Sequence, residues 1–511
     1  MDLLNLTSLF GLFVMVMLAW LFSSHKSKVN WRLVVVGIVF QAALAALFFQ
    51  SQSWTFNRQF DSFPDVLAAI ESEEISKASA IEFFDGAELP SGSFEQLQQA
   101  LETDSLDETQ LRDELVNNDL TISIPRFDKG ILFYAVNSVF ASINAYVAEG
   151  SEFVFKAYPT SGTWNDTTVL LRTFAFGVLP TVIFFASLMA VLYHIGVMQW
   201  LVRSMAWVMQ KTLGTSGPES MAAAANVLVG HTEAPLVIRP YVANMTRSEL
   251  NALMVGGFAT ISGSLMAIFV ANGISAGHLL TASLISAPAA LVIAKVLQPE
   301  TETPGQLDEA VIDEANRPTN VIEAAAIGAS DGLKLALNIT AMLIAFLALL
   351  ALINALIMGL GEAIQFLINL FVVDPVDVDW SLNRLFALLF APLAWVMGIQ
   401  SSDCALAGEL LGKKVVVNEF IAYLDLSAIV NGEVTDADGN VVQLSERTVV
   451  ILTYALCGFS NFGAIGIQIG GIGPLAPERR SDLAQLGLRA MFGGMLAACM
   501  TACMAGIMYM N

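Results

Sequence analysis

Residues 221–242 read MAAAANVLVGHTEAPLVIRPYV, and this stretch decides the fold. Two mostly apolar runs of nine and seven residues, 221–229 and 236–242, flank a polar turn that contains Glu233. Neither run can cross a membrane alone, because a spanning helix needs about 20 apolar residues to cover roughly 30 Å of hydrocarbon. Non-helical backbone at membrane depth is tolerated only inside the protein or beside a water-filled cavity. The stretch therefore predicts a re-entrant helical hairpin.

Residues 402–426 repeat this pattern, with two short apolar runs around a turn at 415–420 that contains Glu419. A carboxylate inside the bilayer costs roughly 2.5–3.5 kcal/mol on insertion scales, and it marks a functional site by default. Glu233 and Glu419 are therefore the leading candidates for ligand contact. Two fixed acceptors suit an uncharged ligand rich in hydroxyl and N–H donors.

Each predicted hairpin is followed by a predicted span that contains a similar glycine-bearing sequence. It is GFATISG at 257–263 after the first hairpin and GFSNFGA at 458–464 after the second. Aligning the Gly-Phe pairs places Thr260 on Asn461. According to the expected number of spans, the chain enters the first of these hairpin-and-helix units from the cytoplasmic side and the second from the non-cytoplasmic side. This arrangement predicts an inverted repeat with substrate and ion sites at the repeat interface. The alternative is that the small residues only allow close helix packing.

The composition indicates a membrane protein that crosses the bilayer several times. Of 511 residues, 55% are hydrophobic and only 14% are charged, against about 25% charged in soluble domains. Eight transmembrane helices are expected at 3–22, 34–49, 170–193, 250–270, 279–297, 335–360, 448–472 and 486–508. Three amphipathic segments are expected to lie at the membrane interface: 131–155, 200–210 and 321–334. The predicted fold class is an all-α polytopic membrane protein.

The distribution of charge predicts the orientation. Asp2 precedes the first span, and the basic turn 25–32 follows it. Because cytoplasmic loops carry excess Lys and Arg, we expect both termini on the non-cytoplasmic side of the cell inner membrane. Residues 51–130 contain 17 acidic and 5 basic residues, and so contribute -12 to the net charge of -22. We expect this segment to be a soluble acidic insertion on the same side, and the acidity argues against binding a nucleic-acid polymer.

Two motifs typical of enzymes are either incomplete or lie in the wrong structural setting. Residues 408–414 echo a P-loop but are one residue short and lack the closing Ser or Thr. The Gly-x-Ser-x-Gly match at 273–277 falls in a turn between two spans rather than between a strand and a helix. We therefore expect no enzyme. A channel-like pore for small polar solutes stays open as an alternative, since re-entrant hairpins also build pores.

Several of these segments resemble one known family. Residues 225–236 (ANVLVGHTEAPL) and 418–423 (NEFIAY) are similar to the two hairpins of concentrative nucleoside transporters. Residues 455–462 (ALCGFSNF) and 477–480 (PERR) resemble the C-terminal core of that family. The resemblance covers roughly 1–50 and 131–511. It implies a homotrimer in the lipid bilayer that moves nucleosides inward with sodium or protons, by an elevator-like motion of a transport domain.

The resemblance also implies site residues. The base would meet His231, Thr232 and Glu233, with Leu265 and Phe459 as apolar neighbours, and the ribose hydroxyls would meet Glu419 and Asn461. A sodium ion, as coupling ion rather than catalytic cofactor, would use the side chains of Asn226 and Thr260 with the carbonyls of Val229 and Ile261. His231 replaces the family's usual glutamine, Ala464 a serine and Leu265 a valine, which leaves base and sugar selectivity open. Proton coupling through His231 is the alternative to sodium.

On this basis the chain is expected to divide into seven segments. They are the first two transmembrane helices (1–50), the acidic insertion (51–130), and interfacial helices with the third transmembrane helix (131–215). Next come the first hairpin with half of the transport domain (216–300) and an acidic cytoplasmic loop with an interfacial helix and a scaffold helix (301–380). The second hairpin with the other half of the transport domain (381–475) and the last transmembrane helix (476–511) complete the chain.

Overall fold

The fold is described from a computed structural model of the chain. The structure describes residues 3–49, 55–59, 121–125, 179–230, 234–271, 274–304, 318–370, 380–435, 439 and 441–509. The chain separates into two compact units, one formed by Met1–Leu47 with Ala135–Asn511 and the other by Phe48–Tyr134. In the described part of the second unit, β1 (Thr55–Gln59) pairs antiparallel with β2 (Thr121–Pro125), with Thr55 opposite Pro125. The predicted interfacial segment 131–155 lies outside the described residues.

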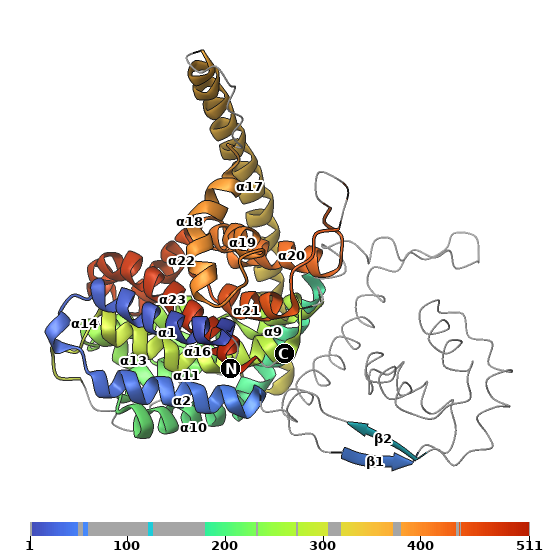
Figure 1. Cartoon of the computed structure of the whole chain (residues 1–511). Helices are drawn as coiled ribbons and strands as arrows, with labels where there is room; N and C mark the ends of the chain where they lie inside the picture. The colour runs from blue at the N-terminus through green and yellow to red at the C-terminus, as the bar shows by residue number, and fades with distance from the viewer. Residues whose placement is uncertain are drawn as a thin grey trace, which may run out of the picture. The chain divides into compact units, whose positions relative to one another are not determined.

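The first unit is built from helices (Figure 1). They are α1 (Leu3–Leu21), α2 (Trp31–Phe49), α9 (Leu179–His194), α10 (Val197–Leu213), α11 (Gly217–Val229), α12 (Ala234–Val237), α13 (Arg239–Val242), α14 (Arg247–Ala259), α15 (Gly263–Ala271), α16 (Ala276–Leu297), α17 (Val321–Asn369), α18 (Leu382–Val396), α19 (Cys404–Val416), α20 (Glu419–Val430), α21 (Glu446–Leu456), α22 (Phe462–Ile472) and α23 (Arg480–Met508). Short 3₁₀ turns lie at Lys26–Lys28, Gly473–Leu475 and Pro477–Arg479.

Five of the described helices are long and apolar enough to cross a membrane. They are α1, α2, α16, the stretch Ala348–Asn369 of α17, and Pro477–Met508, which includes α23. The pair α9 and α10, bent by 76°, adds a sixth if it is counted as one span. These helices and their length confirm the all-helical membrane fold expected from the composition.

Two predicted spans are not continuous helices. Residues 250–270 form α14 and α15 with a break at 260–262, and residues 448–472 form α21 and α22 with a break at 457–461. Thr260 and Asn461, aligned through the Gly-Phe pairs, both lie in the breaks, but Thr260 is the first residue of its break and Asn461 the last residue of the other. In order along the chain, α11–α16 and α19–α23 both run hairpin, broken helix, long helix.

Helix α17 differs from the separate interfacial helix and span that were predicted for residues 321–360. Residues 321–334 were predicted to form a separate interfacial helix, but they continue without interruption into the predicted span 335–360. Gly328 and Gly332 let the first part of α17 lie directly against α9, since a Cβ at either would meet the α9 backbone at 2.6–2.8 Å. With 49 residues, at about 1.5 Å each, α17 is more than twice as long as the hydrocarbon is thick.

The helix α18 was not predicted as an element. It packs along α19, and Gly408 and Gly412 of α19 make this close approach possible. The predicted interfacial segment 200–210 falls on α10, whose Trp200 and Trp207 are exposed while Val202 and Ala206 are buried.

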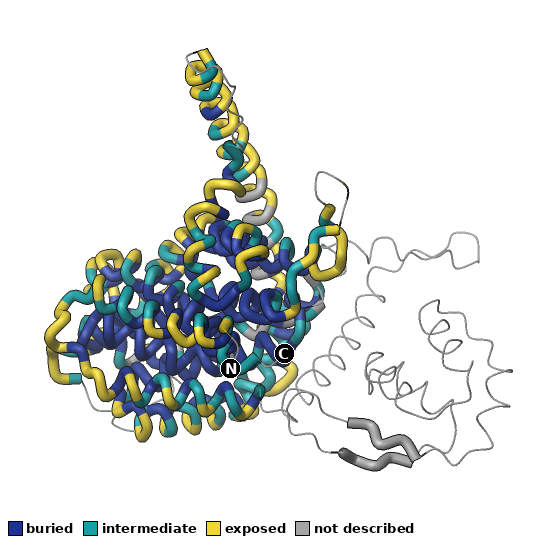
Figure 2. Tube along the Cα trace, in the orientation of Figure 1, coloured by how far each residue is buried: buried dark blue, intermediate teal, exposed yellow. Residues whose placement is uncertain are grey.

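The core is formed by the long helices of the two repeats. Helices α14 and α16 are buried along nearly their whole length, and α23 packs against α1, α14, α16, α21 and α22. Figure 2 shows this buried centre and, in contrast, the exposed outer part of α17. Both hairpins lie against this core, because α11 contacts α14 and α16, and α19 and α20 contact α21.

Candidate functional site

The first of the two short helices predicted for the first hairpin is α11. Helix α11 ends at Val229, and Gly230 has a φ of +86°, which favours glycine. A Cβ at Gly230 would lie 2.7 Å from the Cβ of Ser262, so the turn touches the break between α14 and α15. The predicted base-binding residues His231, Thr232 and Glu233 lie outside the described residues.

The predicted sodium ligands belong to the two segments that meet at this contact, α11 and the break between α14 and α15. Asn226 is buried, and neither its amide oxygen nor its amide nitrogen has a hydrogen-bond partner among the described residues. A Cβ at Gly256 would lie 2.9 Å from the Asn226 Nδ2, so the amide faces α14. The hydroxyl of Thr260 donates to the carbonyl oxygen of Gly256 at 2.9 Å, which leaves its own oxygen free to accept. Ile261 is fully buried beside it.

The second hairpin turns at Val417 and Asn418, a tighter turn than the predicted 415–420. The side chain of Asn418 accepts a hydrogen bond from the Ile421 backbone N–H at 2.9 Å and so caps α20. Glu419 is the first residue of α20 and is 2% exposed. The cap thus fixes the carboxylate at the tip of the hairpin.

Glu419 contacts the break in the second repeat. The Asn461 Nδ2 donates to the Glu419 Oε2 at 3.0 Å, and the Asn461 Oδ1 accepts from the Ala464 backbone N–H at 2.8 Å. Asn461 is therefore the N-cap of α22. The carboxylate lies at the N-terminal ends of both α20 and α22, where the helix dipole favours negative charge. The structure brings the two predicted ribose-binding residues together.

The two residues predicted as apolar neighbours of the base lie in separate elements. Leu265 lies in α15 and is buried, and Phe459 lies in the second break and is half-buried.

The two breaks touch each other at Gly458. This residue has a φ of +128°, and a Cβ there would lie 2.6 Å from the carbonyl oxygen of Phe258 and 2.9 Å from the carbonyl carbon of Ala259. The same two residues end α14, so the start of one break lies against the start of the other. The predicted sodium-binding and ribose-binding groups are thus parts of one continuous region.

Gly458→Ala is expected to lower the yield of folded protein and its apparent Tm. The methyl group would meet backbone atoms, and the backbone conformation itself costs a non-glycine residue about 1–3 kcal/mol. Size-exclusion chromatography and thermal unfolding in detergent measure the effect. Gly466→Ala is the matched control, because nothing lies within 4 Å of a Cβ there. If both variants behaved alike, the contact between the breaks would be refuted.

Comparison with known proteins identifies the family. Family models match residues 10–60 (Na+ dependent nucleoside transporter N-terminus), 175–276 (nucleoside recognition) and 278–506 (Na+ dependent nucleoside transporter C-terminus). The solved structure of CNTnw in an inward-facing substrate-bound state is 34% identical, covers 99% of this chain and 98% of that chain, and superimposes with a TM-score of 0.73. The chain belongs to the concentrative nucleoside transporter family.

Curated relatives of this family support the assignment. An uncharacterized transporter of Haemophilus influenzae is 43% identical over 73% of this chain and 84% of its own length. Solute carrier family 28 member 3 of Eptatretus stoutii is 36% identical over 98% of this chain, and sodium/nucleoside cotransporter 1 of Homo sapiens is 42% identical over 72%. The chain covers 60% and 54% of the length of these two. The family comprises transporters, as expected, and not enzymes.

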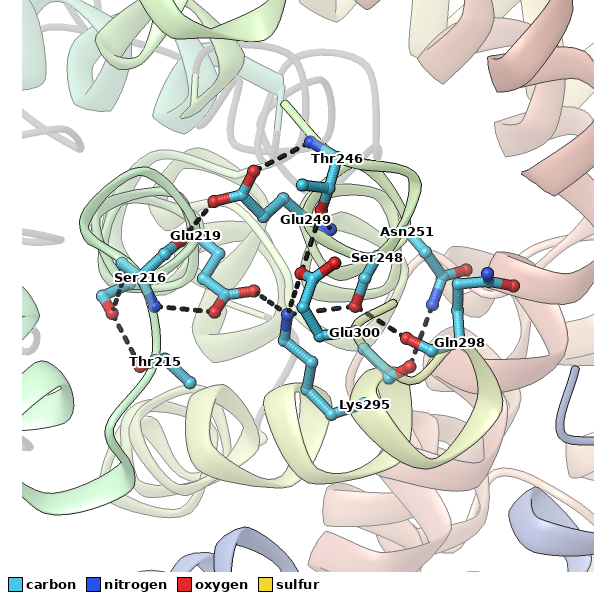
Figure 3. Close-up of polar contacts among 12 residues, drawn as sticks. Thr215, Ser216, Glu219, Thr246, Ser248, Glu249, Asn251, Lys295, Gln298 and Glu300 are labelled. Atoms are coloured by element: carbon cyan, nitrogen blue, oxygen red, sulfur yellow. Dashed lines mark hydrogen bonds and ion pairs between the residues drawn. The ribbon is translucent and has the colours of Figure 1, made fainter. Parts of the chain in front are cut away.

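This family member also holds an ionic network that was not predicted (Figure 3). The Lys295 Nζ lies 2.6 Å from the Glu219 Oε2 and 3.2 Å from the Glu300 Oε2, and it donates to the Ser248 Oγ at 3.0 Å. These groups join the start of α11, the start of α14 and the end of α16. The network thus holds the base of the first hairpin of the transporter against its broken helix.

The sequence contains a signal for this network. Ser216 and Glu219, and again Thr246 and Glu249, have the spacing of a capping box, and both boxes are formed. The two are also joined, because the Ser216 Oγ donates to the Glu249 Oε1 at 2.5 Å. A lysine inside the predicted span 279–297 was a further sign that acidic partners lie nearby.

Proposed function

We propose that this chain is a secondary active transporter that imports nucleosides by symport with sodium. The observation that carries the proposal is the buried pair of Glu419 and Asn461 at the tip of the second hairpin. The Glu419 carboxylate offers hydrogen-bond acceptors to the vicinal hydroxyls of a ribose. The Asn461 amide offers both a donor and an acceptor. Membership of a family described as Na+ dependent nucleoside transporters supports the same substrate.

The substrate site proposed here has a ribose part and a base part. Glu419 and Asn461 bind the ribose. The base contacts His231, Thr232 and Glu233 in the turn of the first hairpin, with Leu265 and Phe459 as apolar neighbours. The contact between Gly458 and the end of α14 supports this assignment, because it brings the breaks of the two repeats together.

The sodium site uses the side chains of Asn226 and Thr260 and the carbonyls of Val229 and Ile261. The Asn226 amide supports this site, since a buried amide without a partner among the described residues suits a bound cation. All-oxygen coordination suits a hard cation. These ligands are neutral, so the ion's charge is uncompensated. An inside-negative potential would favour inward movement of the loaded carrier by about 2.3 kcal/mol per charge per 100 mV.

We further propose a homotrimer in the cell inner membrane, with both termini and residues 51–130 on the non-cytoplasmic side. The segment Ala348–Asn369 of α17 is only 6% buried within the chain. Its apolar surface requires lipid or another copy of the chain to cover it. The short basic turn at 478–480 supports the orientation.

The proposal is tested by uptake of labelled uridine and adenosine into proteoliposomes, with and without a sodium gradient. Thr260→Val, which removes one oxygen ligand at nearly constant volume, is expected to raise the sodium concentration for half-maximal uptake about tenfold, equivalent to ~1.4 kcal/mol. His231→Gln is expected to change base preference while sodium coupling survives.

Two outcomes would favour the alternatives. Sodium-independent uptake that follows a pH gradient and is lost in His231→Gln would indicate proton coupling. Equilibration of nucleoside without accumulation would indicate a channel-like pore.

A further inference from the structure

The second hairpin contains a buried lysine, Lys414, to which neither the proposed substrate site nor the proposed sodium site assigns a role. Lys414 lies near the end of α19 and is 1% exposed. Its Nζ donates to the carbonyl oxygen of Ala455 at 2.7 Å. A buried ammonium group is costly unless other groups compensate its charge. Its neighbour Lys413 differs, because it is paired with Glu409 at 2.7 Å and Asp425 at 2.6 Å.

Lys414 donates to the C-terminal end of α21, the helix that precedes the second break. Ala455 is the last residue but one of α21, and the final carbonyls of a helix have no partner within it. The Tyr423 hydroxyl, from α20, donates to the Thr453 carbonyl in the same turn. Both arms of the hairpin therefore cap the C-terminal end of α21, and a cation is favoured there by the helix dipole.

Glu419, on the other side of the hairpin turn, contacts the other side of the same break. It accepts from Asn461, the N-cap of α22. The hairpin thus places a cation at the C-terminal end of α21 and an anion at the N-terminal end of α22, each matched to the dipole it meets. Lys414 and Glu419 carry opposite formal charges on the two sides of the hairpin turn, near the end of α19 and at the start of α20.

We propose that Lys414 is a positioning residue for transport, which fixes the break between α21 and α22 and supplies the positive charge that holds the Glu419 carboxylate against Asn461. The inference rests on the proposed function, since it assigns Lys414 to the ribose part of that site. Without the ammonium group, the end of α21 loses a cap and Glu419 loses the positive charge on the other side of the hairpin turn. Recognition of ribose hydroxyls therefore depends on a side chain that does not itself touch the nucleoside.

The test compares Lys414→Met, Lys414→Arg and Lys413→Met with the wild type in proteoliposomes. The readout is the ratio of kcat/KM for uridine to kcat/KM for 2′,3′-dideoxyuridine. Lys414→Met is expected to lower this ratio at least tenfold, mainly through the KM for uridine. Lys414→Arg, which keeps the charge, is expected to restore part of it. Lys413→Met is expected to change it less than twofold.

A purely structural role predicts another pattern. In that case Lys414→Met would reduce uptake of both nucleosides equally and leave the ratio unchanged, which would overturn the inference. Absence of uptake of both uridine and adenosine by the wild type would instead refute the proposed function itself.

A second variant covers the case in which Lys414→Met does not fold. Lys414→Met/Glu419→Gln removes both charges, and it is expected to be more stable than Lys414→Met, because no buried carboxylate is left without its compensating charge. A double variant that is as unstable as Lys414→Met would show that the two charges are not coupled, and the inference would fail.

Discussion

Replacing Glu419 with glutamine is expected to reduce uridine uptake by about 10- to 150-fold while the protein still folds. A hydrogen bond from a hydroxyl to a charged acceptor contributes about 1.5–3 kcal/mol, and glutamine offers only a neutral acceptor. The shape of the side chain is retained, and Asn461 can still donate to the glutamine oxygen. The loss should therefore affect transport rather than the packing of the hairpin. Initial rates in proteoliposomes with an imposed sodium gradient measure it.

Glu433→Gln is the matched control for this variant. Glu433 follows α20 closely in the chain, but its side chain is exposed, so the same chemical change removes no buried charge. We expect this control to transport at the wild-type rate. Transport by Glu419→Gln at the same rate as Glu433→Gln would mean that the carboxylate does not bind the substrate.

Replacing Lys295 with methionine is expected to destabilise the protein by about 3–5 kcal/mol, because it leaves buried carboxylates without their cation. The Glu219 side chain is only 2% exposed and lies 2.6 Å from the lysine nitrogen, and Glu300 is a further carboxylate at 3.2 Å. Thermal unfolding in detergent should show an apparent Tm several degrees below that of the wild type.

Two further variants distinguish lost pairing from a general effect of removing a lysine. Lys295→Met/Glu219→Gln is expected to recover part of the lost stability, since one of the unpaired charges is gone. Lys334→Met should have no measurable effect, because Lys334 and its partner Asp331 are 71% and 63% exposed. A Tm of Lys295→Met equal to that of Lys334→Met would contradict the importance of the network.

The short helices of the hairpins could be predicted from local patterns, whereas Glu419 and Asn461 were named together only through the resemblance to the family. A charged residue between two short apolar runs is visible in the sequence, and so is the repeated Gly-Phe pair. The breaks themselves were hidden. Residues 260–262 (Thr-Ile-Ser) are uncharged, so the hydropathy of 250–270 predicts one span. Only the packing of Gly230 and Gly458 against these breaks reveals the interruption.

The errors have physical causes too. Asp331 and Lys334 suggested that an interfacial helix ends before the span at 335, but they pair with each other at 2.9 Å on one exposed face, and α17 continues. Helix α18 was missed because its 15 residues are too few for a span and include Pro392. Lys414 had no visible role, because its partner is a backbone carbonyl 41 residues away that is freed by a break.

The position of α23 in the chain determines the order in which the core can assemble. This helix packs against α1, α14, α16 and α21, yet it is the most C-terminal helix of them. Synthesis proceeds from the N-terminus, so the other four are made before their shared partner exists. The faces of these four helices that α23 covers therefore lack this partner until residues 480–508 have left the ribosome. The packing around the two breaks is consequently completed only after α23 has been made, because α23 contacts both α14 and α21.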